Sequence, residues 1–142
     1  MKRKILSLFL VIFSLFCLVA CDKENNTGAL SCEVVLEEST RVVISVSDKD
    51  GSFTVLDCME LLQEKGEISY KISSGMITEI NGKENATDFS SCWMLYTSDT
   101  EMSNADWGTI DCDGKTLASA IVGADTLTVI SGGVYVWEYQ TF

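Results

Sequence analysis

Residues 54–66 (TVLDCMELLQEKG) decide the fold, because they form the clearest helical period in the chain. The apolar positions on one face of this segment are Val55, Cys58, Met59 and Leu62. Thr54 and Asp57 provide a capping signal at its start, and Gly66 provides a stop signal. We therefore expect one main helix here, with Cys58 facing the core and not solvent.

The segments on both sides of this helix are typical of short strands. β-Branched runs at 33–37 and 42–46 precede it, and strand-like pieces at 68–72, 76–80 and 92–97 follow it. Residues 98–115 are rich in Asp, Ser, Asn and Gly, which predicts a long loop with Trp107 as its apolar anchor. A short helix is expected over 117–122, and a C-terminal hairpin over 127–139 with its turn at Gly132 and Gly133.

These elements predict an α+β fold, a single small domain with one main helix packed on a mixed or antiparallel, β-grasp-like sheet of about five strands. In the last strand Tyr135, Trp137 and Tyr139 alternate with other residues, so the three aromatic side chains share one face. That face is either part of the core or a stacking platform at a sheet edge, and the sequence leaves both interpretations open.

The first 20 residues have the features of a bacterial export signal. Lys2, Arg3 and Lys4 precede an apolar run over 5–20, and its 16 residues fall short of a membrane-spanning helix. Residues 18–21 (LVAC) form a lipobox, so we expect cleavage before Cys21 and lipidation of Cys21. Two or more acyl chains give stable anchoring, which places the protein on the outer face of the cell membrane. Residues 21–31 then act as a flexible tether, and residues 32–142 form the domain.

The composition argues against several classes of function. The chain has 142 residues and no His, so the usual member of catalytic triads and of zinc sites is missing. Removing residues 1–20 leaves 7 cations and 21 acids, a net charge of −14, which argues against a nucleic-acid partner. This charge is either a solvated surface or a face for a cationic partner.

We expect no catalytic residue set, no metal ligands and no cofactor. Residues 48–51 (DKDG) and 111–114 (DCDG) resemble parts of calcium loops, but the further acidic ligands of an EF-hand are missing around both. Both stretches are therefore interpreted as Asp-Gly turns.

Four cysteines remain once Cys17 leaves with the signal and Cys21 is lipidated. They are Cys32, Cys58, Cys92 and Cys112. An even number in an exported chain predicts two disulfides, with three connectivities open, and the alternative is four reduced thiols. Their spacings of 26, 34 and 20 positions do not fit the paired ligands of a zinc site.

Four short motifs resemble, in their order, the transcobalamin-like C-terminal domain. They are residues 53–57 (FTVLD), 75–82 (GMITEING), 93–96 (WMLY) and 135–139 (YVWEY). This bacterial domain of unknown function is similar to the small β-domain of transcobalamin and intrinsic factor. The resemblance covers about residues 33–142. It implies a small extracellular binding module with a corrinoid such as cobalamin as ligand, although this chain offers no room for the helical barrel that completes the site in those relatives.

The resemblance also implies a cysteine pairing. Related members carry one Cys before the tryptophan strand and another in the following loop, which points to a disulfide between Cys92 and Cys112. Cys32 is then left to pair with Cys58.

The expected function is a non-catalytic, lipid-anchored binding module. Trp93, Tyr96 and Trp107 are the candidate ligand contacts, although Trp93 and Tyr96, on or near the central strand, better suit a place in the core. The alternative is a structural or protein-interaction module of the cell surface with no small ligand. An exposed aromatic cleft favours the first interpretation, and a flat apolar patch or an exposed strand edge favours the second.

Overall fold

The computed structural model describes residues 29–50 and 52–142. The predicted signal peptide, Cys21 and most of the predicted tether lie outside the described residues. Within them the chain forms, in order, β1 (Leu30–Glu38), β2 (Arg41–Lys49), α1 (Val55–Glu64), β3 (Tyr70–Ser73), β4 (Met76–Ile80), β5 (Lys83–Glu84), β6 (Ser91–Thr97), β7 (Ser103–Cys112), β8 (Lys115–Ala120) and β9 (Val134–Thr141).

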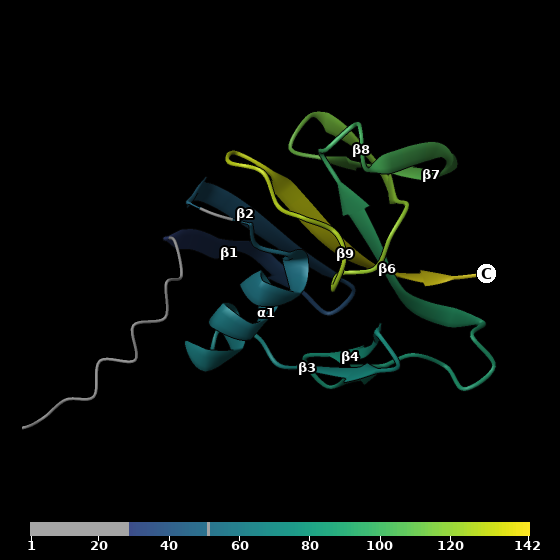
Figure 1. Ribbon diagram of the computed structural model, residues 1–142. Helices are drawn as coiled ribbons and strands as arrows, with labels where there is room; N and C mark the ends of the chain where they lie inside the picture. Colours follow the sequence, from purple (N-terminus) through teal and green to yellow (C-terminus); the bar gives the residue numbers. More distant parts are fainter. Residues whose placement is uncertain (1–28, 51) are drawn as a thin grey trace, which may run out of the picture.

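The described strands form two antiparallel sheets. Six strands pair in the order β1-β2-β9-β6-β8-β7, and three shorter ones pair as β3-β4-β5. Figure 1 shows α1 in front of the larger sheet, with β3 and β4 below it and the β7–β8 hairpin at the opposite end. The small α+β domain is confirmed. The prediction of one sheet of about five strands is wrong for the described residues, which form nine strands in two sheets; β5, β7 and β8 are strands that the sequence patterns did not indicate.

Helix α1 is confirmed where the sequence predicts it. The side-chain oxygen of Thr54 accepts a hydrogen bond from Asp57 N at 3.2 Å, and Thr54 N donates to Asp57 Oδ2 at 2.6 Å. These two bonds form a capping box that satisfies donors left free at the helix start. At the other end Gly66 adopts a φ of 75° and its N–H donates to Gln63 O at 2.9 Å. No helix of the described residues is long and apolar enough to cross a membrane.

The six-stranded sheet has a core on each face. On one face the apolar side of α1 packs against β2, β6 and β9, and Tyr135, Trp137 and Tyr139 all belong to this side, as their alternation predicts. On the other face the β7–β8 hairpin folds back over the sheet. Leu117 of β8 lies there in a second buried cluster with Tyr96 of β6. The aromatic face of β9 is therefore largely core.

Two predictions between residues 98 and 122 are wrong. Residues 103–112 form strand β7 instead of a loop, and residues 115–120 form strand β8 instead of a helix. Asp113 (φ 48°) and Gly114 (φ 74°) make the tight turn that joins them. Because β7 is the edge of its sheet, its polar side chains stay in solvent, and the polar composition that suggested a loop is compatible with a strand.

The predicted C-terminal hairpin is also wrong in its first arm. Residues 127–130 form no strand with β9; their backbone pairs with the start of α1 instead. Val55 N donates to Leu127 O at 2.9 Å, and Val129 N donates to Phe53 O at 2.8 Å. Only an isolated bridge results, between Thr54 and Thr128. This segment thus ties the helix start to the region that follows β8.

Candidate functional site

A cleft of about 310 Å³ lies where the β3–β4 hairpin meets β6, β8, β9 and the residues that follow β8. Trp93, Leu95 and Trp137 line it from the sheet face that packs against α1. Met76 lines it from the hairpin and is half exposed. This volume is at the lower end of the range for small-molecule sites, which is about 300–1,000 Å³. The cleft is therefore sized for a small ligand.

Two glycines shape the border of the cleft. Gly75 has a φ of 80° and follows Ser74 in the tight turn of the β3–β4 hairpin. A Cβ atom at Gly75 would lie 3.2 Å from Asp125 Oδ2, and a Cβ atom at Gly123 would lie 3.0 Å from Asp125 Oδ1. The carboxylate of Asp125 thus packs closely against both glycines, which themselves line the cleft. The hairpin tip and the region after β8 are held together at this point.

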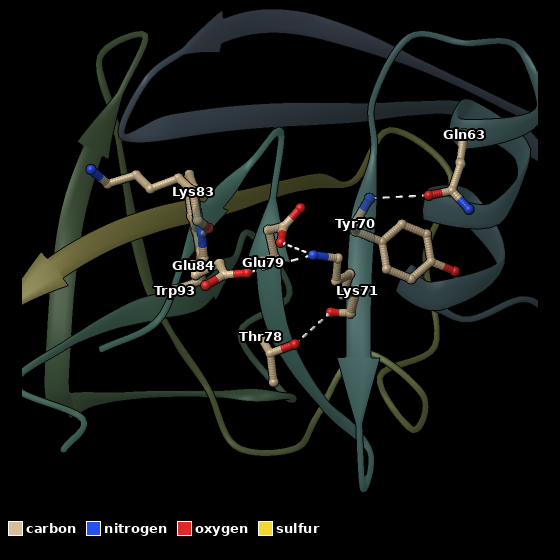
Figure 2. A network of polar contacts seen from close by, with 8 residues as sticks. All are labelled: Gln63, Tyr70, Lys71, Thr78, Glu79, Lys83, Glu84 and Trp93. Atoms are coloured by element: carbon tan, nitrogen blue, oxygen red, sulfur yellow. Dashed lines mark hydrogen bonds and ion pairs between the residues drawn. The ribbon is translucent and has the colours of Figure 1, made fainter. Parts of the chain in front are cut away.

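Trp93 is fixed in place by Lys83 of the short strand β5 (Figure 2) and by Asn85, the residue that follows this strand. Its indole Nε1 donates to Lys83 O at 2.8 Å, and its backbone N donates to Asn85 Oδ1 at 2.9 Å. The ring meets Tyr139 edge to face at 5.4 Å, and Lys83 Nζ lies 4.2 Å above the Tyr139 ring. These contacts make Trp93 a rigid part of the cleft wall.

Trp137 is the neighbouring aromatic residue of the lining, and its polar atom has no partner. Its side chain lies in β9, opposite Leu95 of β6, and the residue is only 5% exposed. The indole Nε1 is buried without a hydrogen-bond partner among the described residues. A buried donor left unpaired costs about 1–3 kcal/mol. A residue that lines this cleft therefore holds a buried donor that lacks an acceptor among the described residues.

The cleft lining carries no charged side chain. Ser74 and Ser119 supply its only side-chain hydroxyls, so it holds no ordinary general acid or base. The charged group that packs against lining residues is the Asp125 carboxylate, beside Gly75 and Gly123. It accepts a hydrogen bond from Thr126 Oγ1 at 3.2 Å and makes no ion pair within the described residues. No cluster of potential metal ligands occurs in the described part of the chain.

Two other hollows differ from the cleft in character. One of about 450 Å³ lies between the β1–β2 turn and the Asn81–Gly82 turn, and its lining includes three charged residues. The other, of about 260 Å³, surrounds Lys71, which pairs with Glu79 and Glu84 on the small sheet (Figure 2). Neither is lined by a buried, unpartnered polar atom of the described residues. The 310 Å³ cleft is therefore the candidate site.

The three predicted contact residues do not come together. Trp93 lines the cleft. Tyr96 is 1% exposed and packs on the opposite face of the sheet, under the β7–β8 hairpin, where burial raises its pKa. Trp107 is 61% exposed and lies on the edge strand β7. It is therefore not the apolar anchor of a loop that the sequence suggested.

The four cysteines of the described residues are free thiols. Cys32 Sγ donates to Cys58 O at 3.9 Å, and a hydrogen bond between the two thiols lowers the pKa of Cys32 and raises that of Cys58. Cys92 Sγ instead contacts Met94 Sδ at 3.7 Å. Burial raises the pKa of Cys92 and of Cys112. Both disulfides stay predictions, and among the described cysteines only Cys32 and Cys58 are in contact with each other.

Trp137 is a site residue that the sequence indicates only as part of the aromatic face of the last strand, and not as a candidate ligand contact. The alternation in residues 134–139 places it with Tyr135 and Tyr139, but no sequence signal distinguishes the ring whose N–H lacks a partner. Comparison with protein-family models, with curated proteins and with solved structures finds no match for this chain. The assignment of the site therefore depends on its geometry.

Proposed function

We propose that this protein is a non-catalytic binding module that captures a small, largely apolar ligand in the cleft between the β3–β4 hairpin and strands β6 and β9. The lipid on Cys21 would hold it at the outer face of a bacterial cell membrane, with residues 22–31 as a spacer. The export signal and lipobox support this location.

The observation that carries the proposal is the buried, unpartnered indole N–H of Trp137 in the lining of an apolar cleft. Native proteins pair most buried polar groups, so an unpaired one in a cleft points to a ligand that supplies the acceptor. Because Nε1 is shielded from solvent, a lining side chain must turn aside to admit that acceptor. Methionine, which lines the cleft at positions 76 and 94, has the flexibility for such a movement.

The lack of charged residues in the lining supports a binding role over catalysis. A transcobalamin-like, β-grasp-like domain remains our proposal for the fold family, and it makes a corrinoid the first ligand to test. A corrin ring is larger than a cleft of about 310 Å³, so only an edge of the ring or one of its side chains would enter. Smaller apolar molecules fill the cleft better.

The test is titration calorimetry of residues 22–142 without lipid. The ligands are cobalamin, a corrinoid without the lower base and a panel of small apolar molecules that carry a carbonyl oxygen. We expect a dissociation constant below about 10 μM, equivalent to roughly 7 kcal/mol, for at least one of them.

Two substitutions on the same hairpin make a matched pair for this test. Met76→Trp places a large ring at the cleft, while Ile72→Trp adds the same ring at an exposed site outside the lining. Binding that is lost with Met76→Trp and kept with Ile72→Trp supports the proposal. Binding that survives both substitutions, or that no ligand shows, refutes it.

The second candidate is a protein-interaction module of the cell surface. It is favoured by Trp107, which is 61% exposed on the edge strand β7, and by Val35 and Leu36 on the opposite edge strand β1. Edge strands with exposed apolar residues are common sites of pairing with other chains. If Trp107→Ala abolishes capture of a surface protein and no small ligand binds, this candidate replaces the first.

A further inference from the structure

We infer that the ligand of the cleft is an amine-bearing apolar molecule whose carbonyl oxygen accepts from Trp137 Nε1 and whose ammonium group faces Asp125. This inference rests on the proposed function and names the chemical class of the ligand.

The ligand atom that meets Trp137 Nε1 must be a hydrogen-bond acceptor. An indole N–H only donates hydrogen bonds, so an ammonium group or a second donor cannot satisfy Trp137. The surrounding lining is apolar and holds a second indole ring, that of Trp93, whose own N–H is already occupied by Lys83 O. The part of the ligand that enters is therefore apolar and carries one well-placed oxygen.

The border of the cleft at Gly75 and Gly123 favours a cation. The Asp125 carboxylate packs against Gly75 and Gly123, two lining residues, and the described chain provides no cation to pair with it. The exported chain has a net charge of −14, so its field attracts cations and repels anions. A carboxylate or phosphate ligand would meet repulsion from Asp125, which lies beside the cleft.

The class is tested with four probes that share one phenyl ring, at pH 6.0, where an α-amino group is protonated. Phenylalaninamide carries the cation and the carbonyl, and phenethylamine carries only the cation. N-acetylphenylalaninamide carries carbonyl groups without charge, and N-acetylphenylalanine carries a negative charge. Calorimetry on residues 22–142 should rank phenylalaninamide first and N-acetylphenylalanine last.

Substitutions assign each contact to its residue. Asp125→Asn should weaken phenylalaninamide about threefold and leave N-acetylphenylalaninamide unchanged, since an exposed ion pair is weak and screened by salt. Asp106→Asn removes an exposed acid of β7 that does not line the cleft, and it should change neither. Trp137→Phe should weaken phenylalaninamide about five- to tenfold and leave phenethylamine unchanged.

The outcomes separate this inference from the proposed function. If N-acetylphenylalaninamide or N-acetylphenylalanine binds as tightly as phenylalaninamide, the assigned class of ligand is wrong, but the proposal that the cleft binds a ligand is kept. The class is equally wrong if corrinoids or neutral apolar molecules bind and none of the four probes does. If nothing binds, both the class and the proposed function fall.

Discussion

Trp93 and Trp137 border the same cleft from neighbouring strands, but only the Trp93 indole N–H has a hydrogen-bond partner within the described residues, Lys83 O at 2.8 Å. Both rings are 5% exposed, so the difference does not reflect access to solvent. The Trp93 N–H is satisfied within the domain, whereas the proposed function assigns to Trp137 an acceptor from a ligand.

Substitution of each tryptophan by phenylalanine should change the free energy of unfolding by a different amount. Trp93→Phe removes a hydrogen bond and leaves the Lys83 carbonyl without this donor, while Trp137→Phe removes a donor that is already unpaired. Both remove the same volume of side chain. We expect Trp93→Phe to lower the free energy of unfolding by about 1–3 kcal/mol more than Trp137→Phe, measured by urea unfolding without ligand. Equal losses would contradict the assigned hydrogen bonding.

The cysteines should respond to oxidation in a fixed order. Cys32 and Cys58 are in contact and Cys32 has a lowered pKa, so Cys32 ionises first and a bond to Cys58 should form before any involving Cys92 or Cys112. This bond would close a 27-residue loop (58 − 32 + 1) and stabilise the domain by about 3.5 kcal/mol in the loop-entropy model.

Peptide mapping under non-reducing conditions, at increasing times after an oxidant is added, measures this order. A Cys92–Cys112 bond that appears first would refute it. Cys58→Ala serves as the control, because it should remove the gain in thermal stability on oxidation.

The capping box of α1 should be worth a measurable part of the stability. Thr54→Ala removes the acceptor for Asp57 N and should lower the free energy of unfolding by about 1 kcal/mol. Thr54→Ser keeps the hydroxyl and should restore most of that loss. Thermal unfolding of the two variants provides the comparison, and an alanine variant as stable as the serine variant would show that the cap is unimportant.

The Lys71–Glu79 pair should contribute to acid sensitivity. Its hydrogen bond lowers the pKa of Glu79 below the ordinary value of 4.5 and raises that of Lys71. Because the pKa of Glu79 is lower in the folded state than in the unfolded state, the pair stabilises the domain fully above pH 4.5. This stabilisation is lost as pH falls through the folded-state pKa of Glu79. Glu79→Gln should therefore flatten the stability curve below pH 4.5, and an unchanged slope would argue against the pair.

Sequence patterns predicted the helix and the strands whose local sequence signals indicate the same structure as their packing in the fold. The capping signal at Thr54 and the apolar period to Leu62 both indicate α1, and the β-branched runs indicate β1 and β2. Strands β7 and β8 were missed because they form by pairing with each other and with β6, and their own sequences carry no clear strand pattern. Polar residues around Trp107 are tolerated at a sheet edge, and the alternation of buried Leu117 and Ser119 is too short to exclude a helix.

The candidate site was predicted only in part. Trp93 was identified as an aromatic residue of a central strand, and it does line the cleft. Tyr96 falls on the opposite face because it stands three positions after Trp93 on β6, and side chains alternate between the two faces of a strand. Trp107 falls elsewhere because β7 pairs with β8 at the edge of the sheet, a long-range feature without a local sequence signal. The importance of Trp137 depends on the absence of a partner for one atom, and such an absence is visible only in three dimensions.

The most direct test of the ligand cleft follows the indole N–H signals by NMR. The chain has three tryptophans, so a ¹⁵N-labelled sample of residues 22–142 gives three such signals, which Phe substitutions assign. When phenylalaninamide is added at pH 6.0, the Trp137 signal should move downfield as its N–H gains an acceptor. The Trp93 signal should move less, and that of Trp107 should stay in place. A shift confined to Trp107, or no shift at all, would contradict binding of phenylalaninamide in this cleft.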